Sequence, residues 1–418
     1  MKCLKKSVVI FITAVCLLIT GCGDTGSLSK LPSSSFHEDK QKLTIMHIDA
    51  DNKRFQDFIE ETEKKLDMEI TVEKYPSNAD NRQAKISTIL ASGDKNIDLI
   101  SVNDEMISEF KHKGYLEPLE KNVMTEEVRD SFPQKYLESI CEENGHIYSV
   151  PFQMDIMMFW VNQELLKQAG LDEIKNTGDF DILQKSLKNP DQYAYGDAWE
   201  NTHVYNSLSQ FVNFWGGDYF DWTDPKTKDA ARYMKSMLDE KNTSPAQFVD
   251  QYEQMEEKFI RGKYGCVFMY TSALGTFLDA DVYGKNKIHM APLPVLHKKK
   301  ATNIATWQYV LNNASENQDA AVRFLQYAAG YEGSTEYAKI MKSYPARVDV
   351  IENEDIDLEG IDMIRKYLRE YTLNARPLCE NSMGAVSDMG KLFQGYVLGQ
   401  CEEDSFFEQA QNCINTYY

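Results

Sequence analysis

The stretch from Gly145 to Asn162, GHIYSVPFQMDIMMFWVN, constrains the fold more than any other part of the 418-residue chain. Its two apolar segments, His146–Val150 and Phe152–Val161, are rich in β-branched and aromatic residues, which predicts two strands. Pro151 between them fixes its own φ, lacks a backbone donor and keeps the residue before it extended, so we expect sheet pairing to be interrupted there. An extended segment interrupted once can leave one sheet and enter another. An edge strand of a single domain explains the local pattern equally well.

The chain before this stretch alternates strands with helices. We expect strands at Leu43–Ile48, Met68–Tyr75 and Ile97–Val102, and helices at Asn52–Asp67, Asp80–Ser92 and Glu105–Lys113. This alternation predicts a parallel α/β sheet, in which ligands bind beyond the carboxyl ends of strands. That rule selects the segments Asp49–Asp51 and Asn103–Asp104, and within them Asp51 and Asp104, as candidate ligand-binding residues.

The chain after this stretch is mostly helical, and its length favours a second lobe, because one hydrophobic core usually stops growing well below 418 residues. The strand predicted at Lys287–Leu293 is expected to return to the first sheet, Tyr344-Pro345 marks a further crossing, and the tail from Gly360 to Tyr418 is expected to be helical throughout. The other predicted strands are Tyr264–Tyr270 and Trp307–Asn312, and the other predicted helices are Asn162–Ala169, Thr202–Trp215, Asp224 to about Lys241, Gln251–Arg261, Glu316–Ala329 and Ser334–Ser343.

The N-terminal segment has the pattern of an export signal. Three lysines precede the apolar run Val8–Thr20, which is too short to span a bilayer comfortably, so residues 1–21 are predicted to be a signal peptide. The run ends in Ile19-Thr20-Gly21-Cys22, which resembles the bacterial lipobox; the resemblance implies that Cys22 becomes lipid-modified and is left as the new N-terminus. A plain signal peptide followed by a buried cysteine is the alternative. Residues 22–40 are rich in glycine and serine and should form a flexible tether.

The net charge argues against nucleic-acid binding, and the cysteine pattern predicts mostly free thiols. The formal net charge is -20, which repels nucleic acid, so we expect no nucleic-acid partner. The body contains five cysteines without a CxxC pair, and we expect them mostly free, with a bridge among Cys379, Cys401 and Cys413 left open.

No catalytic or metal-binding motif survives inspection. The chain contains no GxSxG, HExxH, Walker A loop or GxGxxG, and its seven histidines show no i,i+4 pairing. The pair Asp49/Asp51 could serve a glycosidase, which needs two opposed carboxylates, but 65 acidic residues make such pairs common and a solvated loop is the simpler interpretation. We therefore predict no catalytic residue, no cofactor and no metal.

The order of segments resembles the extracellular solute-binding proteins of ABC importers, in the branch that includes the maltose-binding protein. The matching segments span residues 42 to about 350. The chain departs from the family in one place, where the usual tyrosine-asparagine pair after the crossover strand is replaced by Trp160-Val161-Asn162. The segments are AKISTILASGDKNIDLISVNDEMISEFKHKGYLEPLE, GHIYSVPFQMDIMMFWVNQELLKQAGLDE, FVNFWGGDYFD, FIRGKYGCVFMYTSA, ASENQDAAVRFLQYAAG and SYPARVDV.

The resemblance implies an α/β, two-lobed fold of the type II periplasmic-binding-protein kind, each lobe a mixed sheet flanked by helices. Lobe 1 would comprise residues 41–150 plus 287–343, and lobe 2 residues 151–286 plus 344–418. The ligand would lie between the lobes, and hinge strands near Val150–Pro151, Asn286–Lys287 and Tyr344–Pro345 would close them.

The same resemblance implies a solute-binding function and several site residues. Asp155, Tyr270, Ser272 and Arg347 occupy matching motifs. Sugars pack their C–H faces on aromatic rings and bond their hydroxyls to carboxylates and arginine, which adds Trp215 and Trp307 as candidates. We expect a monomer that is anchored to the membrane by lipid, captures a sugar, specifically an oligosaccharide, and delivers it to the permease subunits of an ABC transporter. The alternatives are a polyamine or peptide ligand on the same fold, or an exported carbohydrate-active enzyme.

Overall fold

The computed structural model describes residues 40–76 and 79–418. The predicted signal peptide, the lipobox cysteine Cys22 and the tether up to residue 39 lie outside the described residues. None of the helices in the described ranges is long and apolar enough to cross a membrane.

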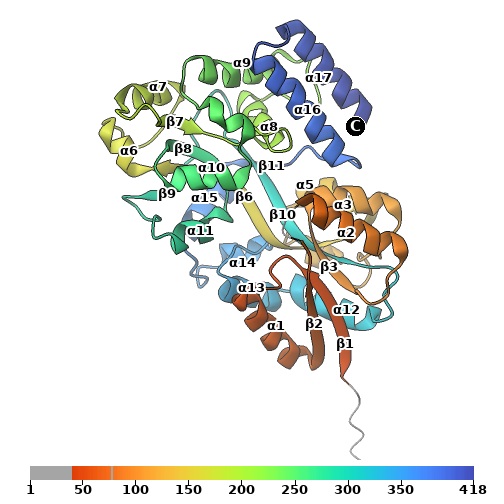
Figure 1. Ribbon diagram of the computed structural model, residues 1–418. Helices are drawn as coiled ribbons and strands as arrows, with labels where there is room; N and C mark the ends of the chain where they lie inside the picture. The colour runs from red at the N-terminus through yellow and green to blue at the C-terminus, as the bar shows by residue number, and fades with distance from the viewer. Residues whose placement is uncertain (1–39, 77–78) are drawn as a thin grey trace, which may run out of the picture. The chain divides into compact units, whose positions relative to one another are not determined.

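The first part of the body is the predicted parallel α/β unit. Strand β1 (Gln41–His47) pairs in parallel with β2 (Met68–Lys74) on one side and with β3 (Leu99–Asn103) on the other. Helices α1 (Lys53–Leu66), α2 (Ala79–Ser92) and α3 (Asp104–Phe110) connect and follow these strands (Figure 1). These strands and helices confirm the sequence prediction.

Strand β6 (Val150–Asn162) runs through Pro151 without a break and links two groups of strands. Its first half, from Val150 to Ile156, pairs with β10 (Ala301–Leu311), and its second half, from Met157 onward, pairs with β8 (Tyr264–Tyr270). The first strand group is therefore β1, β2, β3, β10 and the first half of β6. The second strand group is the second half of β6 with β7 (Tyr193–Gly196), β8 and β9 (Ile288–Ala291).

Pairing is irregular opposite Pro151, as predicted, but the changeover between the strand groups comes five residues later. The register of β6 against β10 shifts between Trp307 and Gln308, opposite Gln153 and Pro151. A proline without a donor is tolerated at such a bulge. The preceding segment also differs from the prediction: only His146–Ile147 forms a strand, β5, in a short hairpin with β4 (Glu142–Glu143).

The strand predicted at Lys287–Leu293 is present as β9, but its predicted destination is wrong. It pairs with Phe159–Asn162 in the second half of β6, on the edge opposite β8, and so belongs to the second strand group. The chain returns to the first strand group along β10, whose residues Trp307–Leu311 pair antiparallel with β3. At Tyr344-Pro345, the predicted third crossing, the chain runs beside β6: the amide of Met154 donates to the carbonyl of Tyr344 at 3.0 Å.

The C-terminal tail is not helical throughout. Strand β11 (Thr372–Ala375) lies between α15 (Ile361–Glu370) and α16 (Ser382–Val397) and pairs in parallel with Ala301–Ile304 of β10. Arg376 follows β11 and precedes Pro377, which disfavours a helical conformation at residue 376. The last helix is α17 (Glu403–Tyr417).

The other helices cover the two strand groups, and the predicted ones are present within a few residues. Trp160, Trp199 and Trp222 are fully buried, and all five cysteines of the described residues are free thiols. These helices are α4 (Glu126–Arg129), α5 (Gln134–Tyr136), α6 (Gln163–Gln168), α7 (Thr177–Ser186), α8 (Val204–Trp215), α9 (Pro225–Asp239), α10 (Tyr252–Ile260), α11 (Ala273–Asp279), α12 (Gln318–Ala329), α13 (Tyr331–Met341) and α14 (Val348–Glu352).

Candidate ligand-binding site

A cavity of about 850 Å³ lies where the two strand groups meet. Its walls come from the start of α3, from β6, β8 and β10, from the segment before α8, from α10 and from the residues around Arg376. The volume falls within the range of about 300–1,000 Å³ that is typical of small-molecule sites.

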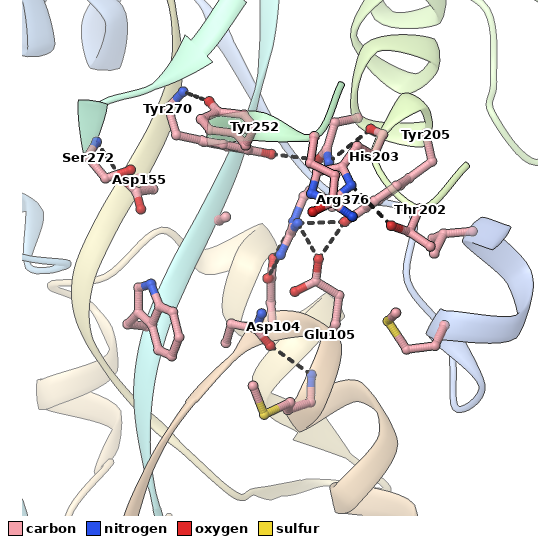
Figure 2. Close-up of a pocket in the computed structure, with 18 of the residues that line it drawn as sticks. Asp104, Glu105, Asp155, Thr202, His203, Tyr205, Tyr252, Tyr270, Ser272 and Arg376 are labelled. Carbon is pink, nitrogen blue, oxygen red and sulfur yellow. Dashed lines mark hydrogen bonds and ion pairs between the residues drawn. The ribbon is translucent and has the colours of Figure 1, made fainter. Parts of the chain in front are cut away.

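One wall is an ionic cluster that we call the Arg376 cluster, made of Asp104, Glu105, Tyr205 and Arg376. The Arg376 Nε donates to Asp104 Oδ2 at 2.9 Å, and its Nη1 donates to Glu105 Oε1 and to the Tyr205 hydroxyl at 2.5 Å each. The Tyr205 hydroxyl in turn donates to Glu105 Oε1 at 2.7 Å. Figure 2 shows the guanidinium between these groups.

Burial sets the protonation behaviour of the Arg376 cluster. Asp104 is the first residue of α3 and is fully buried. Loss of solvation lowers the pKa of Arg376 to about 9 and raises the pKa of Glu105, because each charged form loses water. The Asn103 side chain caps α3 by accepting from the Met106 amide at 3.1 Å, which fixes the start of this helix against the cavity.

Asp155 lies on the other side of the cavity from the Arg376 cluster (Figure 2). One carboxylate oxygen, Oδ1, accepts from the Thr271 hydroxyl at 2.9 Å and from the Ser272 amide at 2.8 Å, just beyond the end of β8. Burial raises the pKa of Asp155, which is only 7% exposed. Within the described residues no cation lies within ion-pair distance of this carboxylate.

Aromatic rings contribute to both sides of the cavity. Trp307 projects from β10, where it lies opposite Asn103 of β3, and the Arg82 guanidinium is 5.6 Å from the centre of its ring. On the other side Tyr270 stacks with Tyr252 at a centroid distance of 5.9 Å. These rings supply apolar faces next to the polar groups.

The segment before α8 supplies polar groups that internal hydrogen bonds hold in place. Glu200 accepts from the Thr202 amide at 2.9 Å and from the Thr202 hydroxyl at 2.6 Å, and lies 3.1 Å from Nδ1 of His203. Burial raises the pKa of Glu200, but these hydrogen bonds outweigh it and the pKa falls below its usual range.

Asp197 fixes the same segment from behind the cavity. Its buried carboxylate accepts from the Tyr195 hydroxyl and the Trp199 indole at 2.8 Å each, from the Ser207 hydroxyl at 2.6 Å and from the Ala198 amide at 2.8 Å. All four donors are neutral, and burial raises the pKa of Asp197.

The structure brings five of the eight predicted ligand-binding residues together in this cavity. They come from four separate parts of the chain, and all of them line this one cavity. The five are Asp104, Asp155, Tyr270, Ser272 and Trp307.

Asp51, Trp215 and Arg347 lie outside the cavity lining. Asp51 is exposed and forms an ion pair with Lys74 at 2.8 Å. Trp215 packs on Tyr233 with centroids 4.8 Å apart and is the last residue of α8, whose cavity-lining residues lie at its start.

Arg347 is a structural residue in this fold. Its Nη1 donates to the Ala329 carbonyl at 2.7 Å and its Nη2 to the Ser131 hydroxyl at 2.8 Å and to Asp349 at 2.6 Å. These bonds hold the end of α12 and the start of α14 to the loop before α5, so the guanidinium is fully used within the core.

Sequence reasoning missed several lining residues, including Glu105, Glu200, Tyr205, Tyr252 and Arg376. Glu105 follows Asp104 in the first turn of α3 and could have been found by the same strand-end rule. Arg376 is harder to predict from the sequence. Its position depends on the four-residue strand β11, which lies in a tail whose sequence otherwise predicts helices.

Comparison with known proteins decides the family. A family described as "Bacterial extracellular solute-binding protein" matches residues 49–335. The chain belongs to this family. Among curated relatives of these solute-binding proteins, it is 23% identical over 239 residues to the "Probable amino-acid ABC transporter periplasmic-binding protein" of Sinorhizobium fredii. That match covers 54% of this chain and 54% of the relative, so the chain spans about half the length of the curated relative.

Solved structures of other solute-binding proteins share the fold over nearly the whole chain. An ABC transporter solute-binding protein of Thermotoga lettingae, bound with α-D-tagatose, is 18% identical with a TM-score of 0.77, covering 90% of this chain and 99% of that one. Maltose-bound MalE3 of T. maritima is 17% identical with a TM-score of 0.76, covering 90% and 99%. The two-lobed α/β fold predicted from the sequence is therefore confirmed.

Proposed function

We propose that this solute-binding protein captures a sugar, specifically an oligosaccharide, in the cavity and delivers it to the permease subunits of an ABC importer. The observation that carries the proposal is the meeting of Trp307, Tyr270 and the buried carboxylate of Asp155 in one cavity of about 850 Å³. Rings pack on the C–H faces of a sugar and the carboxylate accepts from its hydroxyls. Two solute-binding proteins of the same fold are bound to tagatose and maltose, which supports a carbohydrate ligand here.

The strand pairing supports hinge closure between two lobes. We propose that the lobes meet where pairing changes: between Ile156 and Met157 on β6, along β10 before Trp307, and near Tyr344-Pro345. Relative to lobe boundaries at residues 150 and 287, this moves β9 into lobe 2. The Arg376 cluster and Trp307 would then lie where the lobes approach each other.

The N-terminal sequence supports a membrane anchor. We propose that the mature protein is a monomer held on the extracytoplasmic face by lipid on Cys22, with residues 23–40 as its tether. Its role is to bind and deliver the ligand without chemical turnover, since the family consists of binding proteins.

A screen by thermal melting tests the function. The protein without its signal peptide, carrying Cys22→Ser, would be melted with maltose, tagatose, larger oligosaccharides, polyols, amino acids and polyamines. A ligand that binds only the folded state raises Tm, by an amount that grows with the ratio of its concentration to Kd. We expect shifts with carbohydrates and unchanged carbohydrate masses after incubation.

Other outcomes of the screen would replace the proposal. A shift with amino acids alone would favour the function named for the Sinorhizobium relative, and a shift with polyamines alone would favour a cation carrier. Cleaved oligosaccharides would indicate an enzyme.

A further inference from the structure

The cavity has more acidic than basic side chains. Five carboxylates line it, against two guanidinium groups, those of Arg82 and Arg376. Excess charge of one sign in a cleft raises the local concentration of ligands of the opposite sign. The five carboxylates are Asp104, Glu105, Asp155, Glu200 and Glu253.

The two guanidinium groups do not offset this excess at Asp155. Arg376 is engaged by both Asp104 and Glu105, and it lies across the cavity from Asp155 (Figure 2). Arg82 lies over the rings of Trp307 and Tyr75, at 5.6 and 5.7 Å from their centres. Arg376 also lies 5.8 and 5.9 Å from the ring centres of Tyr205 and Tyr270, but its ion pairs are with Asp104 and Glu105 and not with Asp155.

Asp155 differs from the other carboxylates of the lining. Glu200 is satisfied by Thr202 and lies beside His203, and Glu253 is exposed on α10. Asp155 is more than nine-tenths buried, borders the cavity, and is hydrogen-bonded by Thr271 and Ser272, which are neutral donors. A buried carboxylate is stabilised far more by a cation at hydrogen-bond distance than by a neutral donor.

The rings near Asp155 are also suited to a cation. Tyr270 and Tyr252 stack beside this part of the cavity, and burial raises the pKa of both tyrosines. Aromatic faces attract ammonium groups. Asp155 and these two rings line the same cavity, in which the Arg376 guanidinium also lies 5.9 Å from the centre of the Tyr270 ring.

We propose that the ligand is an aminated sugar whose protonated amine pairs with Asp155. This inference rests on the proposed carbohydrate function. A simple polyamine fits the lining less well, because amide and hydroxyl side chains occupy much of the remaining wall and are suited to sugar hydroxyls. These are Gln83, Asn103, Thr202, Gln251, Gln254 and Thr306; the Thr202 and Thr306 hydroxyls already donate to Glu200 and Tyr136 and would act toward a sugar as acceptors.

Matched sugar pairs test the inference on the unmodified protein. Calorimetric titration at pH 6 would compare D-glucosamine with D-glucose, D-galactosamine with D-galactose, and the β-1,4-linked glucosamine dimer with cellobiose. An amine with a pKa of about 8 is protonated there. We expect the aminated member of at least one pair to bind about tenfold or more tightly, with an affinity that falls as salt is added and as pH rises through the amine pKa.

An Asp155→Asn variant tests the residue. It should lose at least about tenfold more affinity for the aminated sugar than for the neutral partner, because both sugars lose a hydroxyl acceptor but only the aminated one loses an ion pair. Asp239→Asn is the matched control, because Asp239 pairs with Lys235 on the surface of α9, away from the cavity, and should leave both affinities unchanged. Melting curves would establish that each variant is folded. The comparison of sugar pairs on the wild type does not depend on the variants.

Each other result overturns a defined part of the account. If neutral sugars bind as tightly as or more tightly than their aminated partners, the inference is wrong and the proposed function stands. If aminated sugars bind the wild type more tightly but Asp155→Asn keeps the same preference, the assignment of the amine to Asp155 is wrong. If neither kind of carbohydrate binds, the proposed function fails as well.

Discussion

Arg376 and Asp104, which are 272 residues apart in the chain, are joined by a buried ion pair in which Nε lies 2.9 Å from Oδ2. The contact connects the residue after β11 with the first residue of α3, so it links the tail of the chain to the first strand group. The Arg376 guanidinium also bonds to Glu105 and Tyr205. The residue as a whole is only 8% exposed. A charge network of this kind is sensitive to removal of one partner.

Replacing Arg376 with alanine should lower the free energy of unfolding by about 3–5 kcal/mol, because two buried carboxylates would lose their cation. Urea unfolding would measure the change. Arg369→Ala is the control, since Arg369 pairs with Glu352 on the surface and its loss should have little effect. Equal stability of Arg376→Ala and the wild type would contradict the structural role of the cluster.

His47 should make stability depend on pH. It is fully buried, stacks on Phe55 at a centroid distance of 3.8 Å, and its Nδ1 accepts from the Asp49 amide at 3.0 Å. Burial lowers the pKa of His47 to about 3 in the folded protein, against about 6.5 in an unfolded chain. Between these two pKa values the unfolded chain binds a proton at His47 and the native state does not. The free energy of unfolding therefore falls as pH drops from about 6.5 toward 3.

Between pH 7 and pH 4.5 this difference amounts to about 2–3 kcal/mol, at about 1.4 kcal/mol per unit. A His47→Asn variant keeps an acceptor for the Asp49 amide but cannot take up the proton. Urea unfolding at both pH values should show a smaller loss of stability for the variant than for the wild type. The same loss in both proteins would mean that His47 is protonated in the native state.

Replacing Asp197 with asparagine should weaken both the stability of the protein and ligand binding, although Asp197 does not line the cavity. Asn at this position would place an amide N–H₂ against two hydrogen-bond donors, because each carboxylate oxygen accepts from two of the four groups. The expected cost is about 2–4 kcal/mol of stability, with weaker ligand binding through displacement of Glu200. Urea unfolding and titration together measure it; unchanged values for both would show that the four bonds are dispensable.

Cys22 should anchor the mature protein. Replacing Cys22 with serine removes the thiol that the lipobox resemblance requires, so the protein should be released into the medium or retain its signal peptide. Fractionation and mass spectrometry would distinguish these forms. A cleaved variant that stays in the membrane fraction would rule out this anchor.

The parallel unit could be predicted because its signals are local: Met68–Lys74 alternates buried and exposed residues, and Asn52 caps α1. The destination of β9 could not, because an apolar strand fits the edge of either strand group. Trp215 shows the same limit at the site. The position of Trp215 on an apolar helix face predicts that its ring is buried. It does not predict whether the ring contacts a ligand or, as observed, Tyr233. Arg376 reaches the cavity only through the pairing of β11 with β10, which no short motif encodes.

The most direct test of the central claim is calorimetric titration of Trp307→Ala and Trp215→Phe with the carbohydrate that gives the largest thermal shift in the wild type. Trp307 lines the cavity, whereas Trp215 packs on Tyr233 outside it. Loss of a stacked ring should cost Trp307→Ala about 2–4 kcal/mol of binding free energy, roughly thirtyfold to a thousandfold in Kd, while Trp215→Phe should bind like the wild type. If Trp307→Ala is folded and binds that carbohydrate with unchanged affinity, sugar capture on Trp307 in this cavity is contradicted.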